Sequence, residues 1–161
     1  MPQTIPKAPQ RRRAVLFLGT SNTGRSILAE AMLTRLGEGA FRAYSAGSHP
    51  APALDPAILA YLTQQRYPTE LLRPKSWDEF AGEDAPALDI VVTLSNSLIG
   101  EVCPVFWTGR PTTTHWPLRE DAPLDVIHDA LARRIAALIE LPFDSVDAMG
   151  LQMKLDAIGR L

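Results

Sequence analysis

The sequence is short of cysteine, of net charge and of long apolar runs. Its 161 residues include one cysteine, Cys103, so an internal disulfide cannot form and nothing argues for an oxidising compartment. The net charge of −2 gives no electrostatic case for binding nucleic acid or an anionic membrane. No apolar run approaches the ~18 residues of a membrane span, and the N-terminus lacks the apolar region of a secretory signal. We therefore expect a cytoplasmic protein with neither nucleic acid nor membrane as a partner.

The remaining composition is that of a folded α/β domain. Hydrophobic residues make up 46% of the chain and charged residues 21%, which is ordinary for a globular protein. Residues 1–13 are proline-rich and polar, and we expect a disordered arm there, before one domain of residues 14–161. Strand patterns cover residues 14–18, 41–46, 88–94, 105–107 and 112–116. Helical patterns cover residues 26–36, 56–66, 76–81, 124–141 and 145–158. Strands that alternate with helices indicate a parallel α/β sheet.

Two of the predicted helices begin with capping signals. Asp55 precedes Pro56, which combines a capping carboxylate with proline at the first helical position. Ser76 stands three residues before Glu79, which is the pattern of a capping box. Both signals place a helix start within a residue or two.

The most informative segment is Ala14–Glu30, which reads AVLFLGTSNTGRSILAE. A buried strand, a polar loop and a helix N-terminus follow one another there, and together they form an anion site. Loop N–H groups and the helix dipole attract an anion, and Arg25 adds a planar guanidinium that can bind two oxygens. We expect an oxyanion to be bound by Gly19, Thr20, Ser21, Asn22, Thr23, Gly24, Arg25 and Ser26.

Other polar segments are expected near this loop. In open α/β sheets, ligands bind beyond the carboxyl ends of the strands. This rule places the segments after Leu94 and after Trp116 around the same crevice as the loop.

Nucleotide binding is a weaker alternative for the loop. Its sequence GTSNTGRS is one residue away from the nucleotide-binding pattern G-x-x-x-x-G-K-[ST]. Arg25 replaces the lysine, which normally acts as a compact charge on the outer phosphates. No strand ends in an aspartate that could hold Mg²⁺, since Asp89 lies at the start of its strand.

The chain resembles the low-molecular-weight protein tyrosine phosphatase superfamily, and within it the thioredoxin- or glutaredoxin-linked arsenate reductases. Those proteins carry a strand followed by C-x-x-x-x-x-R-S, and the same frame here is Gly19 to Ser26. The resemblance continues through SILAEAML, RAYSAGSHP, YPTE, KSWDEFA, DIVVTL, GEVCPVF, HW and LPFDSVDAMGLQMKLDAIGR. It implies a three-layer α/β/α sandwich with a four- or five-stranded, mainly parallel sheet. We expect no cofactor.

Three departures from the family pattern bear on the chemistry. The nucleophilic cysteine falls on Gly19, and the resolving cysteine of the reductases falls on Ser95. The general acid, an aspartate shortly after H-W, matches Asp121 or Glu120 only after a shift of about one residue. No intact catalytic residue is therefore expected.

Thiol chemistry is excluded at the foot of this loop. In the family a thiolate there attacks phosphorus or arsenic, with a pKa lowered by the helix N-terminus. Glycine has no side chain to attack with, and the hydroxyls of Thr20, Ser21 and Thr23 are poorer, misplaced nucleophiles. Cys103 alone cannot complete a redox pair, which leaves reduction through an external thiol as the remaining redox route.

The loop neighbourhood offers further candidate roles. In the family the residue at Asn22 braces the loop, and Ser26 is either a loop-orienting hydroxyl or a first-turn residue. Glu30, Asn22 and Ser45 match a monovalent cation site of some reductases, against which we favour a solvated glutamate and a turn serine.

Residues outside the loop are given structural roles. We expect His115 and Trp116 to be packing residues at a strand end, and Cys103 to be a buried small hydrophobe. His49 and His128 have no partner pattern for a metal, so no metal site is predicted.

The sequence thus predicts a catalytically degenerate family member that binds phosphate, arsenate or a similar oxyanion. One alternative is an arsenate reductase or tyrosine phosphatase that works by a non-standard route. Another is a pseudophosphatase that docks a phosphorylated protein partner, which would need Trp77, Trp107 or Trp116 to line an open cleft.

Overall fold

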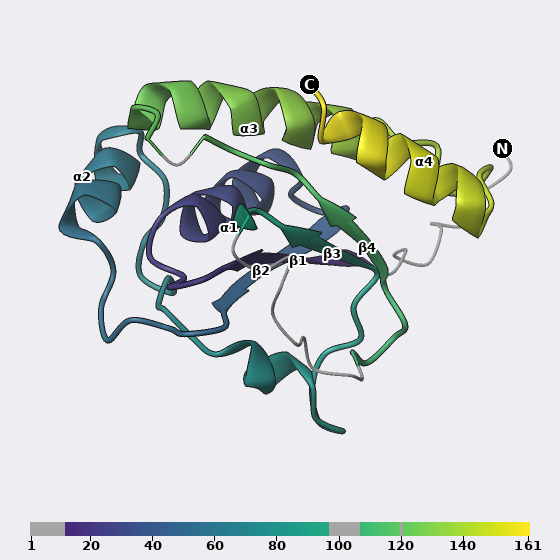
Figure 1. The fold of residues 1–161 in the computed structure, drawn as a ribbon, viewed down its shortest axis with the longest axis horizontal. Helices are drawn as coiled ribbons and strands as arrows, with labels where there is room; N and C mark the ends of the chain where they lie inside the picture. Colours follow the sequence, from purple (N-terminus) through teal and green to yellow (C-terminus); the bar gives the residue numbers. More distant parts are fainter. Residues whose placement is uncertain (1–11, 97–106, 120) are drawn as a thin grey trace, which may run out of the picture.

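A parallel four-stranded sheet forms the centre of the computed structural model, which describes residues 12–96, 107–119 and 121–161. The strands are β1 (Arg13–Gly19), β2 (Phe41–Gly47), β3 (Ile90–Thr93) and β4 (Thr112–His115), in the order β2-β1-β3-β4 (Figure 1). Every pair of neighbouring strands is parallel, which confirms the predicted α/β class. Of the strand predicted over 105–107, residues 105 and 106 lie outside the described residues, and Trp107 is not in a strand.

Four α-helices and one 3₁₀ helix accompany the sheet in the described residues. They are α1 (Arg25–Leu36), α2 (Pro56–Gln64), η1 (Trp77–Phe80), α3 (Leu124–Ile139) and α4 (Ala148–Ile158). The predicted cap of α2 is confirmed, because the Asp55 carboxylate accepts a hydrogen bond from the Ala57 amide at 2.9 Å. Before η1, Ser76 accepts from the amide of Asp78, whereas Glu79 pairs with Arg73 instead of completing a capping box.

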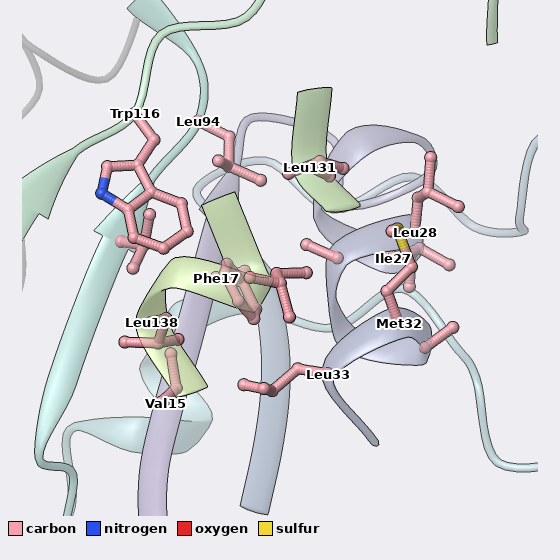
Figure 2. Packing of buried hydrophobic residues seen from close by; sticks show 14 of the residues in the cluster. Val15, Phe17, Ile27, Leu28, Met32, Leu33, Leu94, Trp116, Leu131 and Leu138 are labelled. Carbon is pink, nitrogen blue, oxygen red and sulfur yellow. The ribbon is translucent and has the colours of Figure 1, made fainter. Parts of the chain in front are cut away.

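Alternation along β1 separates two buried clusters, one on each face of the sheet. Val15 and Phe17 face the larger cluster, which contains side chains of all four α-helices. Figure 2 shows Phe17 within this cluster, between side chains of α1 and Trp116, whose ring centroid lies 6.2 Å away. Leu16 and Leu18 face the smaller cluster, where Trp77 and Phe80 of η1 cover the sheet. Of the two outer layers expected, the described residues build one from the α-helices and the other from η1 and loops.

The order of the strands places three chain segments at one edge of the sheet. Since β1, β3 and β4 are parallel neighbours, their carboxyl ends lie together. The loop 19–24 follows β1, Leu94–Asn96 follow β3, and Trp116–Arg119 follow β4. Among the described residues, no helix is long and apolar enough to span a bilayer.

Candidate functional site

A cavity of about 310 Å³ lies at this edge of the sheet, beside the N-terminus of α1. The predicted loop forms its polar side. Three other segments complete the described lining: the start of α2, the end of β3, and the start of α3. The described lining residues are Gly19, Thr20, Ser21, Asn22, Thr23, Gly24, Arg25, Ser26, Asp55, Ala57, Ile58, Leu94, Ser95, Ala122, Leu124 and Ile127.

The carbonyl groups of the loop turn toward the segment that follows β2. The amide of His49 donates to the carbonyl of Thr20 at 2.9 Å, and the amide of Ala51 donates to that of Ser21 at 3.1 Å. In a trans peptide the C=O and the N–H point in opposite directions, so the N–H groups of Ser21 and Asn22 point away from this segment. Gly47 permits the close approach, because a Cβ there would lie 2.5 Å from the Thr20 carbonyl oxygen.

Asn22 braces the loop, as the sequence predicted. It is 1% exposed and adopts a left-handed backbone with φ of 54°, which asparagine tolerates better than most residues. Its Nδ2 donates to the Ser26 hydroxyl at 2.9 Å, and its Oδ1 accepts from the Lys75 amide at 2.9 Å. The side chain therefore ties the loop both to α1 and to the segment before η1.

The Ser26 hydroxyl lies beneath the first residue of the loop. It is buried, and a Cβ added to Gly19 would lie 3.0 Å from its Oγ. Because Asn22 donates to this oxygen, the hydroxyl keeps its own proton to donate. The first turn of α1 holds no acidic residue, and no described side chain caps it. The positive end of the helix dipole, at the end of the loop, is therefore not offset by an acidic side chain of the first turn.

Arg25 connects the loop to the segment after β4. Its Nη1 donates to the Leu118 carbonyl at 3.3 Å, and the residue lines the cavity. That segment is itself anchored, since Arg134 of α3 donates to the Pro117 carbonyl at 2.8 Å. Trp116 is fully buried and donates from its indole to the Leu155 carbonyl, which agrees with the packing role predicted for it.

Ser95 joins the loop at the end of β3. It is 3% exposed, and its hydroxyl lies 3.2 Å from the hydroxyl of Thr20. The structure therefore brings Gly19 and Ser95, which sequence reasoning singled out together, into the lining of one cavity.

Asp121, one of the two acidic residues proposed as a general acid, does not line the cavity. Asp121 is exposed, contacts Arg119 at 3.7 Å and is not part of the lining. Glu120 lies outside the described residues, as does Cys103. The carboxylate that does line the cavity is Asp55, which sequence reasoning treated only as a helix cap.

The tryptophans required for an aromatic cleft lie elsewhere. Trp77 and Trp116 are buried in the two hydrophobic clusters, and Trp107 packs against the smaller one. The described lining contains no aromatic side chain. It includes instead the aliphatic Ile58, Leu124 and Ile127, which the rule about strand ends missed because they stand on helices.

The ammonium group of Lys75 lies close to Glu30 and Ser45. Its Nζ donates to the carbonyls of Ser45 at 2.9 Å and Arg73 at 3.0 Å, and lies 3.6 Å from the Glu30 carboxylate. Ser45 also donates its hydroxyl to Glu30. Burial lowers the pKa of Lys75, and the charge of Glu30 acts in the opposite direction. Of the residues considered for a cation site, Glu30 and Ser45 thus contact the ammonium of a lysine. The described residues contain no group of three or more His, Cys, Asp or Glu side chains that could hold a metal ion.

His115 links the ends of β3 and β4. Its Nδ1 lies 2.7 Å from the Thr93 hydroxyl, and its Nε2 lies 3.0 Å from the Asn96 side-chain oxygen. A neutral ring protonated on Nε2 satisfies both contacts, with Thr93 donating to Nδ1. Burial lowers the pKa of His115, which favours this neutral form.

The sequence profile of the low molecular weight phosphotyrosine protein phosphatase family matches residues 14–116. The chain therefore belongs to this family. A comparison with curated proteins found no match.

Solved structures of arsenate reductases share the fold. The thioredoxin-dependent arsenate reductase of Corynebacterium glutamicum is 28% identical with a TM-score of 0.64; the alignment covers 82% of this chain but only 62% of that chain. The arsenate reductase of Archaeoglobus fulgidus is 25% identical with a TM-score of 0.62, over 79% of this chain and 99% of that one. An arsenate reductase described in its phosphate-binding state is 21% identical with a TM-score of 0.63, over 79% and 96%.

Proposed function

We propose that this protein binds a tetrahedral oxyanion of the phosphate or arsenate type in the loop 19–26 and performs no thiol chemistry on it. The observation that carries the proposal is the direction of the loop peptides. Hydrogen bonds from His49 and Ala51 hold the carbonyls of Thr20 and Ser21 away, so the N–H groups of Ser21 and Asn22 and the N-terminus of α1 are left to attract an anion. Arg25 supplies the cationic side chain of the same cavity.

The absence of thiol chemistry rests on the residues at the two positions where the family resemblance expects cysteine. Gly19 has no side chain, and the Ser95 hydroxyl contacts Thr20. Without a thiolate at position 19, no negative charge lies beneath the anion, and the Ser26 hydroxyl can donate there. The phosphate-binding state described for one related arsenate reductase supports the choice of ligand.

Calorimetric titration with phosphate, arsenate and sulfate tests the binding. We expect Arg25→Ala to weaken phosphate binding about tenfold or more, because a hydrogen bond to a charged group contributes roughly 1.5–3 kcal/mol. Arg133→Ala removes the same charge from an exposed position on α3 and should leave the affinity unchanged. No binding at millimolar phosphate, or equal affinities of wild type and Arg25→Ala, would contradict the proposal.

Assays of arsenate reduction and of p-nitrophenyl phosphate hydrolysis test the missing chemistry. The wild type should show neither activity, whereas Gly19→Cys should gain phosphatase turnover if the loop is intact. An added Cβ requires a shift of only a few tenths of an ångström from Ser26, and Gly19→Ala controls for that shift. Wild-type turnover equal to that of Gly19→Cys would show that a non-standard catalytic route exists.

A further inference from the structure

The lining of the cavity beside the loop also includes an aliphatic wall. Ile58 of α2, Leu94 after β3, and Leu124 and Ile127 of α3 contribute to it. Ile58, Leu94 and Ile127 are each at most 5% exposed, so the wall is part of the packed core and is fixed in place. An inorganic oxyanion is hydrated on all sides in water, so contact with this apolar surface does not stabilise it.

The cavity also has room for more than an anion. Its volume of about 310 Å³ is many times the roughly 30 Å³ occupied by one water in the liquid. An anion held by the loop and Arg25 would leave space beside Leu124 and Ile127. When an apolar group covers apolar surface in that space, the free energy of binding becomes more favourable.

The described lining also limits what the group can be. It holds no aromatic ring to stack on a phenyl group, so the wall offers only aliphatic packing. Its one carboxylate is that of Asp55, which is engaged with the Ala57 amide at the start of α2. A cationic group would have to reach this one carboxylate, whereas an alkyl group needs only the aliphatic wall.

We propose that the ligand is a singly substituted tetrahedral oxyanion with a short alkyl group, that is, an alkylphosphonate or an alkyl phosphate monoester. This inference rests on the proposed oxyanion site and adds the class of ligand. The loop and Arg25 bind the oxygens, and the alkyl group packs against Ile58, Leu124 and Ile127.

A calorimetric series of phosphate, methylphosphonate, ethylphosphonate and propylphosphonate tests the wall. Affinity should rise about fourfold with each methylene, which corresponds to about 0.8 kcal/mol per buried CH₂. Propyl phosphate is measured in parallel, and its affinity relative to propylphosphonate shows whether the site prefers a phosphate ester or a phosphonate. A flat series in which phosphate still binds would overturn the alkyl inference alone, whereas no binding of any member would overturn the oxyanion site itself.

Two comparisons, the first of them isosteric, test the character of the group. 2-Aminoethylphosphonate has the shape of propylphosphonate but carries an ammonium, and it should bind more weakly. Tighter binding of 2-aminoethylphosphonate would show that its ammonium pairs with the Asp55 carboxylate. That result would contradict the proposal of an alkyl group. Phenyl phosphate should not bind more tightly than propyl phosphate, and the opposite result would point to an aryl ligand instead.

Substitutions at the start of α3 test the wall itself. Leu124→Ser should weaken propylphosphonate binding about tenfold and leave phosphate binding unchanged. Val126→Ser is the matched control, because Val126 lies on the same helix, is 48% exposed and does not line the cavity. Ile58→Ser with the control Leu59→Ser repeats the test on α2. Equal effects of the lining and control variants would contradict the inference.

Discussion

Asn22 determines the shape of the anion loop through a single side chain. One end of its amide donates to Ser26, and the other accepts from Lys75, so both its donor and its acceptor are used inside the protein. The left-handed backbone at this position adds a second requirement, which asparagine meets at low cost. The residue therefore links the local conformation of the loop to its tertiary anchoring.

We expect Asn22→Ala to lower the free energy of unfolding by about 2–4 kcal/mol. Each lost hydrogen bond contributes roughly 0.5–1.5 kcal/mol, and a left-handed alanine costs about 1 kcal/mol more. Urea unfolding of the wild type and the variant measures the difference. Asn22→Gly removes the bonds but accepts the backbone, so it should recover about 1 kcal/mol of the loss.

Thr23→Ala is the control within the same loop. Thr23 shares one partly buried hydrogen bond with Ser21, so its loss should cost no more than about 1 kcal/mol. If this variant is as unstable as Asn22→Ala, the loop depends on hydroxyl contacts in general and not on the bracing by Asn22.

The bracing role of Asn22 was predictable from the sequence, whereas the contacts of the Lys75 ammonium with Ser45 and Glu30 were not. Family resemblance identified Asn22 as a loop residue, and its contacts bear this out. Nothing in the local sequence indicates that the ammonium of Lys75 lies between Ser45 and Glu30, because that contact joins segments far apart in the chain. A long-range contact of this kind depends on the packing of β2 against the segment before η1.

The start of α2 has two roles that oppose each other. The Asp55 carboxylate caps the helix that carries Ile58, which stabilises the wall of the cavity. The same carboxylate lines the cavity and repels any anion bound there. Stability and anion affinity should therefore respond in opposite directions to its removal.

We expect Asp55→Ala to lower the free energy of unfolding by about 1 kcal/mol, the usual cost of losing an N-cap, and to raise phosphate affinity severalfold. Asp55→Asn keeps an oxygen for the Ala57 amide, so it should raise the affinity with little loss of stability. Urea unfolding and calorimetric titration at the same salt concentration measure the two effects.

Asp147→Ala separates capping from charge. Asp147 caps α4 by accepting from the Gly150 amide at 2.7 Å, and it does not line the cavity. Its loss should cost a similar free energy of unfolding without changing phosphate affinity. An affinity change as large as that of Asp55→Ala would mean that overall net charge, and not the position of Asp55, sets the binding.

For the helices and strands, the sequence predicted which elements form better than it predicted the residues at which they begin and end. The sequence placed β1 at 14–18 and the structure shows Arg13–Gly19, because Arg13 pairs with Phe41 and Gly19 pairs with Gly47 of β2. The last helix begins at Ala148 and not at residue 145, since the Asp147 carboxylate provides the cap. Ends depend on which neighbour supplies the last hydrogen bond, and a single sequence does not contain that information.

Across the whole molecule, the two faces of the sheet are covered unequally. The unbroken apolar run 14–18 predicted a buried strand, which is typical of parallel sheets covered on both faces. The sequence did not reveal that all four described α-helices contribute to one cluster, while the other is closed by η1 and loops. That division depends on how the connections cross the sheet, and a helical pattern alone does not state which face it covers.

His115 makes the stability of the molecule depend on pH, because it joins the ends of two central strands. Burial lowers its pKa below the ordinary value of about 6.5; nearby Arg134 adds to this shift, and hydrogen bonding to the Thr93 backbone opposes it. The neutral ring is therefore favoured in the folded state, where it contacts Thr93 and Asn96. Protonation is easier in the unfolded chain, so acid shifts the equilibrium toward unfolding.

We expect His115 to contribute its full stabilisation above about pH 6.5 and to lose it as the pH falls through its lowered folded-state pKa. The difference in unfolding free energy between wild type and His115→Gln should therefore shrink between pH 7.5 and pH 5. Urea unfolding at half-unit pH steps measures this difference, and His49→Gln, at an exposed position, controls for the loss of a histidine elsewhere. A difference between wild type and His115→Gln that stays constant across this range would show that the pKa of His115 is the same in the folded and unfolded states.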